Sequence, residues 1–176
     1  MAYLVCMLLW RSTGSSGGLL CMWSLLAVDI GLRTGLALFG QDGRLCWYRS
    51  HNFGTAARLR RGVRGVLAEI PHLAWLMLEG GGTLADIWSR EAARRSIPVR
   101  QISAEVWRRQ LLYPREQRRG VHAKDNAADL ARRVIVWSQA RRPTSLRDDA
   151  AEAILIGLWG VLEVGWLERL PDELRR

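Results

Sequence analysis

Residues 24–40 read SLLAVDIGLRTGLALFG, two apolar runs separated by a glycine-rich turn. The first run is aliphatic and β-branched, which predicts a buried strand over 24–30. The turn at 31–35 sends the second run back beside it as another strand. Asp29 is the only charge in the first run and lies at its carboxyl end. The stretch therefore predicts a strand pair with an isolated acid at one edge.

The pattern beyond residue 40 predicts an α/β protein. A turn at 41–43 leads to a third strand, so the chain opens with a meander of antiparallel strands. Later strands alternate with helices, which predicts parallel crossovers and a mixed five-stranded sheet with helices on both faces. The elements expected after the meander are a helix at 55–70, a strand at 73–79, helices at 83–96 and 103–111 around a strand at 98–102, and helices at 123–138 and 148–164.

The composition indicates a polyanionic partner. The 176 residues suit one domain, 49% are hydrophobic, and the net charge is +9. Such a basic excess favours nucleic acid. Residues 115–147 hold nine basic and three acidic residues, and Arg58 to Arg64 form a second basic band. Lys124 is the only lysine among 26 basic residues, and arginine does not replace a compact ammonium group equally well.

The amino-terminal segment differs from the rest. Residues 1–10 are apolar but too short to span a bilayer, and a Gly/Ser-rich stretch follows. We predict that 1–22 form a disordered leader or an upstream-start extension, with a short membrane-surface anchor as the alternative, and that 23–176 form a single domain. The three cysteines lack metal-like spacing, which predicts a reduced, cytoplasmic protein without disulfides.

Acids recur at the ends of predicted elements. Glu79 ends the fourth strand and precedes glycines, so Asp29 and Glu79 would share a sheet edge if their strands are parallel neighbours. Asp149 and Glu152 share a helix face at i, i+3, as do Asp148 and Glu152 at i, i+4. Singly, each acid has a structural explanation as a turn, cap or dipole partner. Together they favour Mg²⁺ or Mn²⁺, and two such ions can hydrolyse a phosphodiester.

Three motifs carry a family resemblance. LLAVDIGLRTGLALFG (25–40), LMLEGG (76–81) and RDDAAEAILIGLWG (147–160) resemble RuvC-type Holliday junction resolvases, within the retroviral-integrase and ribonuclease H superfamily, and look most like phage or prophage relatives. The resemblance implies a ribonuclease H-like fold and a homodimeric crossover junction endodeoxyribonuclease that nicks four-way DNA junctions symmetrically with two metal ions. It implies these catalytic residues: Asp29, Glu79, Asp149 and Glu152 as metal ligands, and Lys124 near the scissile phosphate.

The sequence departs from the family at Glu152, where bacterial members commonly have Asp, and Asp148 is an extra candidate ligand. Other interpretations stay open: a ribosomal-RNA-processing nuclease resembling RuvC, a non-catalytic junction-binding protein, and, less consistent with the length, an actin-like kinase. Leu84, Ile87, Trp88 and Ala92 form a stripe that either packs on the sheet or forms a dimer face. Trp107 or Tyr113 either packs inward or stacks on a splayed base.

Overall fold

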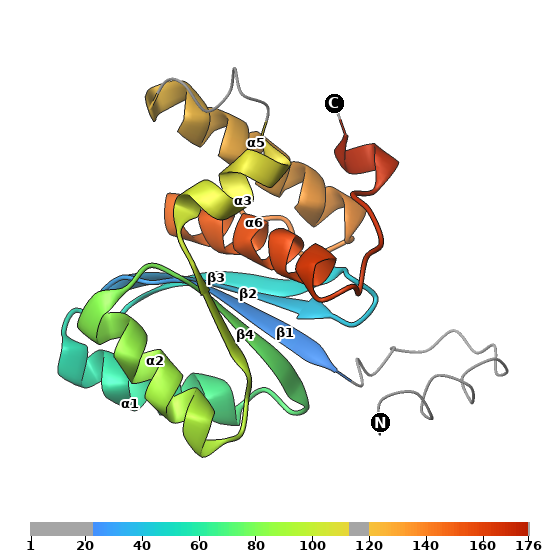
Figure 1. Cartoon of the computed structure of the whole chain (residues 1–176). Coiled ribbons are helices and arrows are strands. Elements are labelled where there is room, and N and C mark those ends of the chain that lie inside the picture. The colour runs from blue at the N-terminus through green and yellow to red at the C-terminus, as the bar shows by residue number, and fades with distance from the viewer. Residues whose placement is uncertain (1–22, 113–119, 176) are drawn as a thin grey trace, which may run out of the picture.

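One mixed sheet organises the chain in the computed structural model, which describes residues 23–112 and 120–175, apart from the side chains of 120–125 (Figure 1). Its order is β3-β2-β1-β4-β5. The first three strands are antiparallel, and β4 and β5 run parallel to β1. The predicted mixed five-stranded sheet is confirmed. The strands are β1 Ser24–Asp29, β2 Arg33–Gly40, β3 Leu45–Asn52, β4 Leu73–Glu79 and β5 Val99–Ile102.

Helices cover both faces of the sheet. In Figure 1, α1 and α2 lie below the sheet, and α3, α5 and α6 lie above it. The predicted order of elements is confirmed, and every predicted helix end falls within three residues of the end in the structure. The helices are α1 Ala56–Ala68, α2 Gly82–Arg94, α3 Ala104–Leu111, α5 Gly120–Trp137 and α6 Asp148–Glu163, followed by the short η2 Asp172–Leu174.

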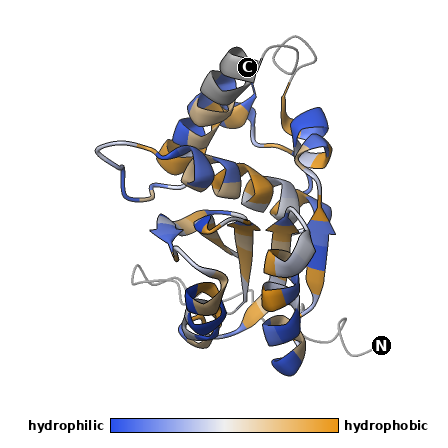
Figure 2. Ribbon diagram, turned by 90° about the vertical axis from the view of Figure 1, so that its left-hand side faces the viewer, coloured by the Kyte–Doolittle hydropathy of each residue, from blue (hydrophilic) through white to orange (hydrophobic). Residues whose placement is uncertain are grey.

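The middle of the central strand β1, residues 25–28, is apolar because both faces of the strand are buried. Leu25 and Ala27 join the core beneath α5 and α6, whereas Leu26 and Val28 join the core with α1 and α2. Side chains alternate between the faces of a strand, so a strand between two helical layers has no polar face. Figure 2 shows these layers edge on, with hydrophobic residues where the helices meet the sheet.

Helix α6 approaches the sheet unusually closely. Twelve of its sixteen residues are buried. At Gly35, which pairs with Asp29 across β1 and β2, an added Cβ would lie 1.8 Å from the backbone oxygen of Asp149. At Gly157 an added Cβ would lie 2.2 Å from the Phe39 ring. Only glycine allows this approach, and it brings the first turn of α6 beside the end of β1.

The apolar stripe of α2 packs inside the molecule. Ile87, Trp88 and Ala92 are buried in the core between α1, α2 and the sheet, and Leu84 packs against that core. Of the two interpretations, packing on the sheet is therefore correct, and the stripe is not available as a dimer face.

Some predictions fall outside the described residues. These are the leader at 1–22 and the segment 113–119, which contains Tyr113. The division into leader and domain stays a prediction. In the part of the chain that the structure describes, no helix has the length and apolar character needed to cross a bilayer.

Candidate metal centre

Strand pairing brings two of the predicted acids together. Asp29 and Glu79 are direct partners in the parallel register of β1 and β4, so they leave the sheet at the same edge. The Ile30 N–H donates to the Glu79 carbonyl over 3.0 Å, which ties the two strand ends. Gly80 then turns the chain away with φ 112°, a conformation suited to glycine. Parallel pairing thus produces the shared edge that the sequence predicted.

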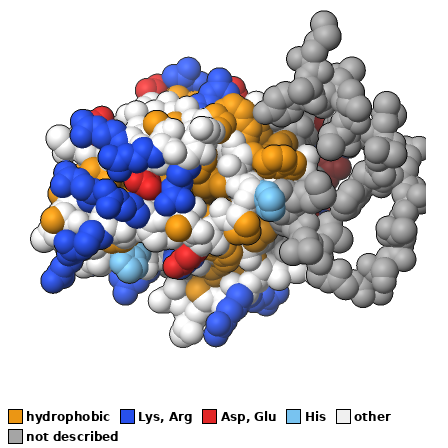
Figure 3. Space-filling view, turned by 90° about the horizontal axis from the view of Figure 1, so that it is seen from below, with side chains coloured by type: hydrophobic (Ala, Val, Ile, Leu, Met, Phe, Trp, Pro, Cys, Tyr) orange, Lys and Arg blue, Asp and Glu red, His pale blue; other side chains and the backbone are white. Residues whose placement is uncertain are grey.

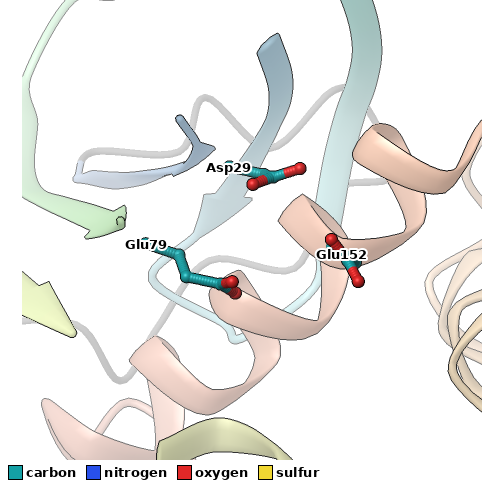
Figure 4. Close-up of side chains that lie close together, drawn as sticks. All are labelled: Asp29, Glu79 and Glu152. Atoms are coloured by element: carbon teal, nitrogen blue, oxygen red, sulfur yellow. The ribbon is translucent and has the colours of Figure 1, made fainter. Parts of the chain in front are cut away.

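Glu152 completes a cluster of three carboxylates. One oxygen each from Asp29, Glu79 and Glu152 lies within 4.8 Å of the others (Figure 4). Glu79 is only 9% exposed, whereas Asp29 and Glu152 retain more contact with solvent. Three acids from two strands and one helix therefore converge although they are far apart in sequence.

The cluster is electrostatically unfavourable for the chain alone. Burial raises the pKa of Asp29 to about 7, with further increases from Glu152, Glu79 and Asp149, and Arg108 opposes them. Burial also raises the pKa of Glu79, while its hydrogen bond from Trp107 lowers it. Carboxylates held this close favour a bound cation, and their hard oxygen donors suit Mg²⁺ or Mn²⁺. The donor set therefore fits the metal that the sequence predicted.

Asp149 lies beside the cluster and is not one of its three oxygen donors. The Ser50 hydroxyl of β3 donates to one oxygen of its carboxylate, and its other oxygen accepts the Ala150 N–H over 2.9 Å. Its charge contributes to the raised pKa of Asp29, so it remains close enough to act on the same site. Its role as a metal ligand stays a prediction.

Asp148 lines a small hollow between α5 and α6. Glu152 and three alanines form the rest of its lining, Ala127 and Ala128 from α5 and Ala151 from α6. Small side chains here leave space next to the Glu152 carboxylate. Lys124 lies on α5 one turn before this hollow, but its side chain lies outside the described residues. Its proximity to a phosphate stays a prediction.

Helix α3 holds two of the three clustered carboxylates. The Trp107 indole N–H donates to one Glu79 oxygen, and Arg108 donates to Glu152 over 2.8 Å. The Arg108 guanidinium also lies over the Trp107 ring, 5.0 Å from its centroid. Trp107 is fully buried, so its alternative role as a stacking platform is wrong. Neither hydrogen bond was predicted from the sequence. The sequence did contain an indication of them, because Trp107 was expected to face inward and Arg108 follows it directly.

Comparison with known proteins defines the fold. No protein-family model matches the sequence, and no curated protein matches it. RuvC of T. thermophilus, solved in complex with a Holliday junction substrate, superposes with a TM-score of 0.58 at 16% identity, covering 81% of this chain and 96% of that chain. A yeast mitochondrial Holliday junction resolvase superposes with a TM-score of 0.53 at 11% identity, covering 81% of each. The chain therefore has the RuvC-like, ribonuclease H-like fold.

Proposed function

We propose that this chain is a metal-dependent endonuclease that nicks four-way DNA junctions symmetrically. The observation that carries the proposal is the convergence of Asp29, Glu79 and Glu152 within 4.8 Å on a RuvC-like fold. The net charge of +9 supports a nucleic-acid substrate. T. thermophilus RuvC was solved in complex with a Holliday junction substrate, and the yeast mitochondrial neighbour is described as a Holliday junction resolvase, which supports branched DNA as the substrate.

In this proposal Asp29, Glu79 and Glu152 hold the metal, with Asp149 as a further ligand. When bound, two Mg²⁺ or Mn²⁺ ions supply an activated water and stabilise the leaving oxygen of the phosphodiester. Asp29 would give up its proton on binding, because burial and the neighbouring carboxylates raise its pKa to about 7. Trp107 keeps the Glu79 carboxylate in one orientation through its N–H.

Arg108 has a different role in the proposed reaction. In the structure it pairs with Glu152, one of the proposed ligands. If Glu152 held the metal, its ion pair with Arg108 would weaken, and the planar guanidinium fork of Arg108 would be well suited to a substrate phosphate. Lys124 supplies a second cation on the α5 side. These residues bind and orient the phosphate beside the acids.

Symmetric cutting also requires two active sites. Each chain contributes one carboxylate cluster, so paired nicks in strands of like polarity need a homodimer. The surface that joins the two copies is separate from the buried stripe of α2.

The test is incubation with a synthetic four-way junction in the presence of Mg²⁺ or Mn²⁺. We expect paired nicks from the wild type, and binding without cutting from Asp29→Asn, which keeps the size of the side chain and removes the charge. Cutting of linear RNA instead of the junction would support the RNA-processing alternative. If both proteins bind the junction and neither cuts it with either metal, a non-catalytic junction-binding protein is the better description.

A further inference from the structure

The outward surfaces of α1 and α2 carry a dense group of arginines. This surface lies on the side of the sheet away from α5 and α6, and Figure 3 views it directly, with basic side chains gathered on one half. All its members are exposed. We call it the arginine face, and its residues are Arg58, Arg60, Arg61 and Arg64 of α1 and Arg90 and Arg94 of α2.

The charge of α1 is unfavourable for the helix itself. Its thirteen residues include four arginines and no acid, and Arg58 lies in the first turn, where the macrodipole favours acids. Arg60 and Arg64 are i, i+4 neighbours, and Arg58 and Arg61 are i, i+3 neighbours. Such like-charge pairs each cost about 0.2–0.5 kcal/mol. Folding alone gives no reason for this arrangement.

Gly65 adds a second cost on the same face. An added Cβ at Gly65 would meet nothing within 4 Å, whereas one at Gly62 would lie 2.2 Å from the Phe53 ring. The close contact with Phe53 therefore explains why Gly62 is a glycine, whereas no packing contact explains Gly65. An exposed glycine inside a helix costs about 1 kcal/mol relative to alanine. Gly65 lies one turn after Arg61 and has no side chain. The helix surface is therefore recessed beside the arginines, and a polymer backbone can approach it closely.

Internal acids neutralise little of the arginine face. Glu91 of α2 is buried and accepts ion pairs from Arg64 at 3.7 Å, Arg94 at 3.2 Å and Arg95 at 3.1 Å, so three cations share one carboxylate. The other members of the face take part in no ion pair within the described residues. These are Arg58, Arg60, Arg61 and Arg90.

We propose that the arginine face binds the phosphate backbone of double-stranded DNA, as a contact surface separate from the metal centre. Guanidinium groups suit phosphates, and α1 is about 20 Å long, enough to follow several base pairs. The inference rests on the proposed function for the identity of the polymer as DNA. An arm of the branched substrate would then lie against α1 and α2. The crossover would lie at the edge of the sheet where Asp29, Glu79 and Glu152 meet, which we call the acidic edge.

Other partners fit the arginine face less well. Membrane-surface helices insert large apolar side chains, and the exposed residues of α1 are alanine, glycine and arginine. Single strands stack on aromatic rings, and Trp88, the only aromatic residue of α1 and α2, is fully buried. A second copy of the chain would present the same positive surface, which opposes self-association. A duplex backbone needs neither apolar nor aromatic contacts.

The experiment measures binding of a 40-base-pair linear DNA duplex in EDTA, so that no cutting occurs. The variant is Arg60→Gln with Arg61→Gln, because neither arginine has an ion pair with any residue that the structure describes and glutamine keeps helix propensity. We expect its affinity near 0.1 M salt to fall roughly tenfold to a hundredfold, and the slope of log affinity against log salt to decrease by about two. Its melting temperature should be unchanged or higher, because like-charge pairs are removed.

The matched control removes the same charge elsewhere. Arg169→Gln with Arg175→Gln changes two exposed arginines near the carboxyl end, outside both the arginine face and the basic segment 115–147. We expect this pair to lose less than threefold in affinity. Equal losses in the two pairs would overturn the proposal, as would a loss by the α1 pair of binding to anionic lipid vesicles without a loss of duplex binding. Because the assay needs neither metal nor cleavage, its failure is distinct from failure of the nuclease proposal.

Discussion

Helices α6 and α1 lie on opposite faces of the same sheet and carry charge in opposite ways. Helix α6 buries twelve residues and begins with Asp148 and Asp149, which its macrodipole favours. Helix α1 buries three residues and carries arginines from its first turn on, which its macrodipole opposes. The acids of α6 become unfavourable only when the fold brings Glu152 to Asp29 and Glu79, whereas the arginines of α1 are unfavourable within the helix itself.

The difference shows two ways of building a charged site. The acidic edge depends on tertiary packing, because its members come from three elements held together by a buried helix. The arginine face is local, because its members follow each other along two surface helices. Each collects charge of one sign at a cost to stability, and each suits a ligand of the opposite sign, a divalent cation in one case and phosphates in the other.

The largest expected effect tests how strongly the acidic edge depends on packing. Gly35→Ala places a Cβ against the Asp149 backbone, so α6 must move off the sheet. We expect a loss of roughly 2–4 kcal/mol in the free energy of unfolding, measured with urea, together with loss of junction cutting. Gly157→Ala, which meets a side chain and not backbone, should cost less. A Gly35→Ala protein with wild-type stability and activity would contradict this close approach.

The next effect tests the electrostatic cost of the cluster. Asp29 has a folded pKa of about 7 against an ordinary 3.8, so the folded state retains a proton that the unfolded chain releases. The metal-free wild type should therefore lose stability as pH rises from about 4 to about 7, and the full penalty applies above pH 7. Asp29→Asn removes this penalty, so its free energy of unfolding at pH 8 should exceed that of the wild type by about 2 kcal/mol. This is less than the full pKa shift would give, because solvent screens the partly exposed carboxylate.

The control for Asp29→Asn is the same comparison at pH 4, where the wild-type carboxyl is protonated and the difference should disappear. Saturating Mn²⁺ should reverse the order at pH 8, because the wild type gains stability from the bound ion and the variant gains less. Equal stability of the two proteins across pH 4–8 would show that burial and the neighbouring acids do not destabilise the Asp29 carboxylate.

A smaller effect is expected when the hydrogen bond from Trp107 of α3 to Glu79 is removed. Trp107→Phe keeps an aromatic ring and removes the N–H that holds Glu79. We expect a tenfold to hundredfold fall in Mn²⁺ affinity and in the rate of junction cutting. Trp88→Phe is the matched control, because the Trp88 indole N–H is buried without a hydrogen-bond partner in the described structure. Equal losses in the two variants would mean that Trp107 acts only through packing.

The smallest effect tests the arginine face as a local feature. Gly65→Ala adds a methyl group in open space on α1 and should raise the free energy of unfolding by about 1 kcal/mol. The three clustered carboxylates are not part of α1 and come from β1, β4 and α6, so Mn²⁺ affinity should not change. Urea unfolding and Mn²⁺ titration check both statements. A stability loss at Gly65 would mean that the glycine serves the helix and not an approaching ligand.

Strand pattern and the ends of elements were predictable from the sequence because they follow local rules. The apolar run of β1 and the turn at Gly31 predicted the meander. The acids at the strand ends predicted that Asp29 and Glu79 share one edge of the sheet. Each of these depends on periodicity within a short segment. The helical spacing predicted only that Glu152 shares a face with Asp148 and Asp149, and its place in one site with the two strand-end acids was implied by the family resemblance.

Side-chain contacts between distant elements were not predictable in the same way. The hydrogen bond from Trp107 to Glu79 joins residues 28 apart, and that from Ser50 to Asp149 joins residues 99 apart. Such contacts depend on how rigid elements dock, which no local pattern encodes. The role of Gly35 was also missed, because a glycine after a turn has a local explanation that hides its contact with α6.

The most direct test of the metal centre is an anomalous difference map from crystals soaked in Mn²⁺. We expect a peak within bonding distance of the Asp29, Glu79 and Glu152 carboxylates in the wild type, and a weaker peak or none in Glu152→Gln crystals. A wild-type map without density between these three residues, from crystals that bind Mn²⁺ elsewhere, would contradict the account.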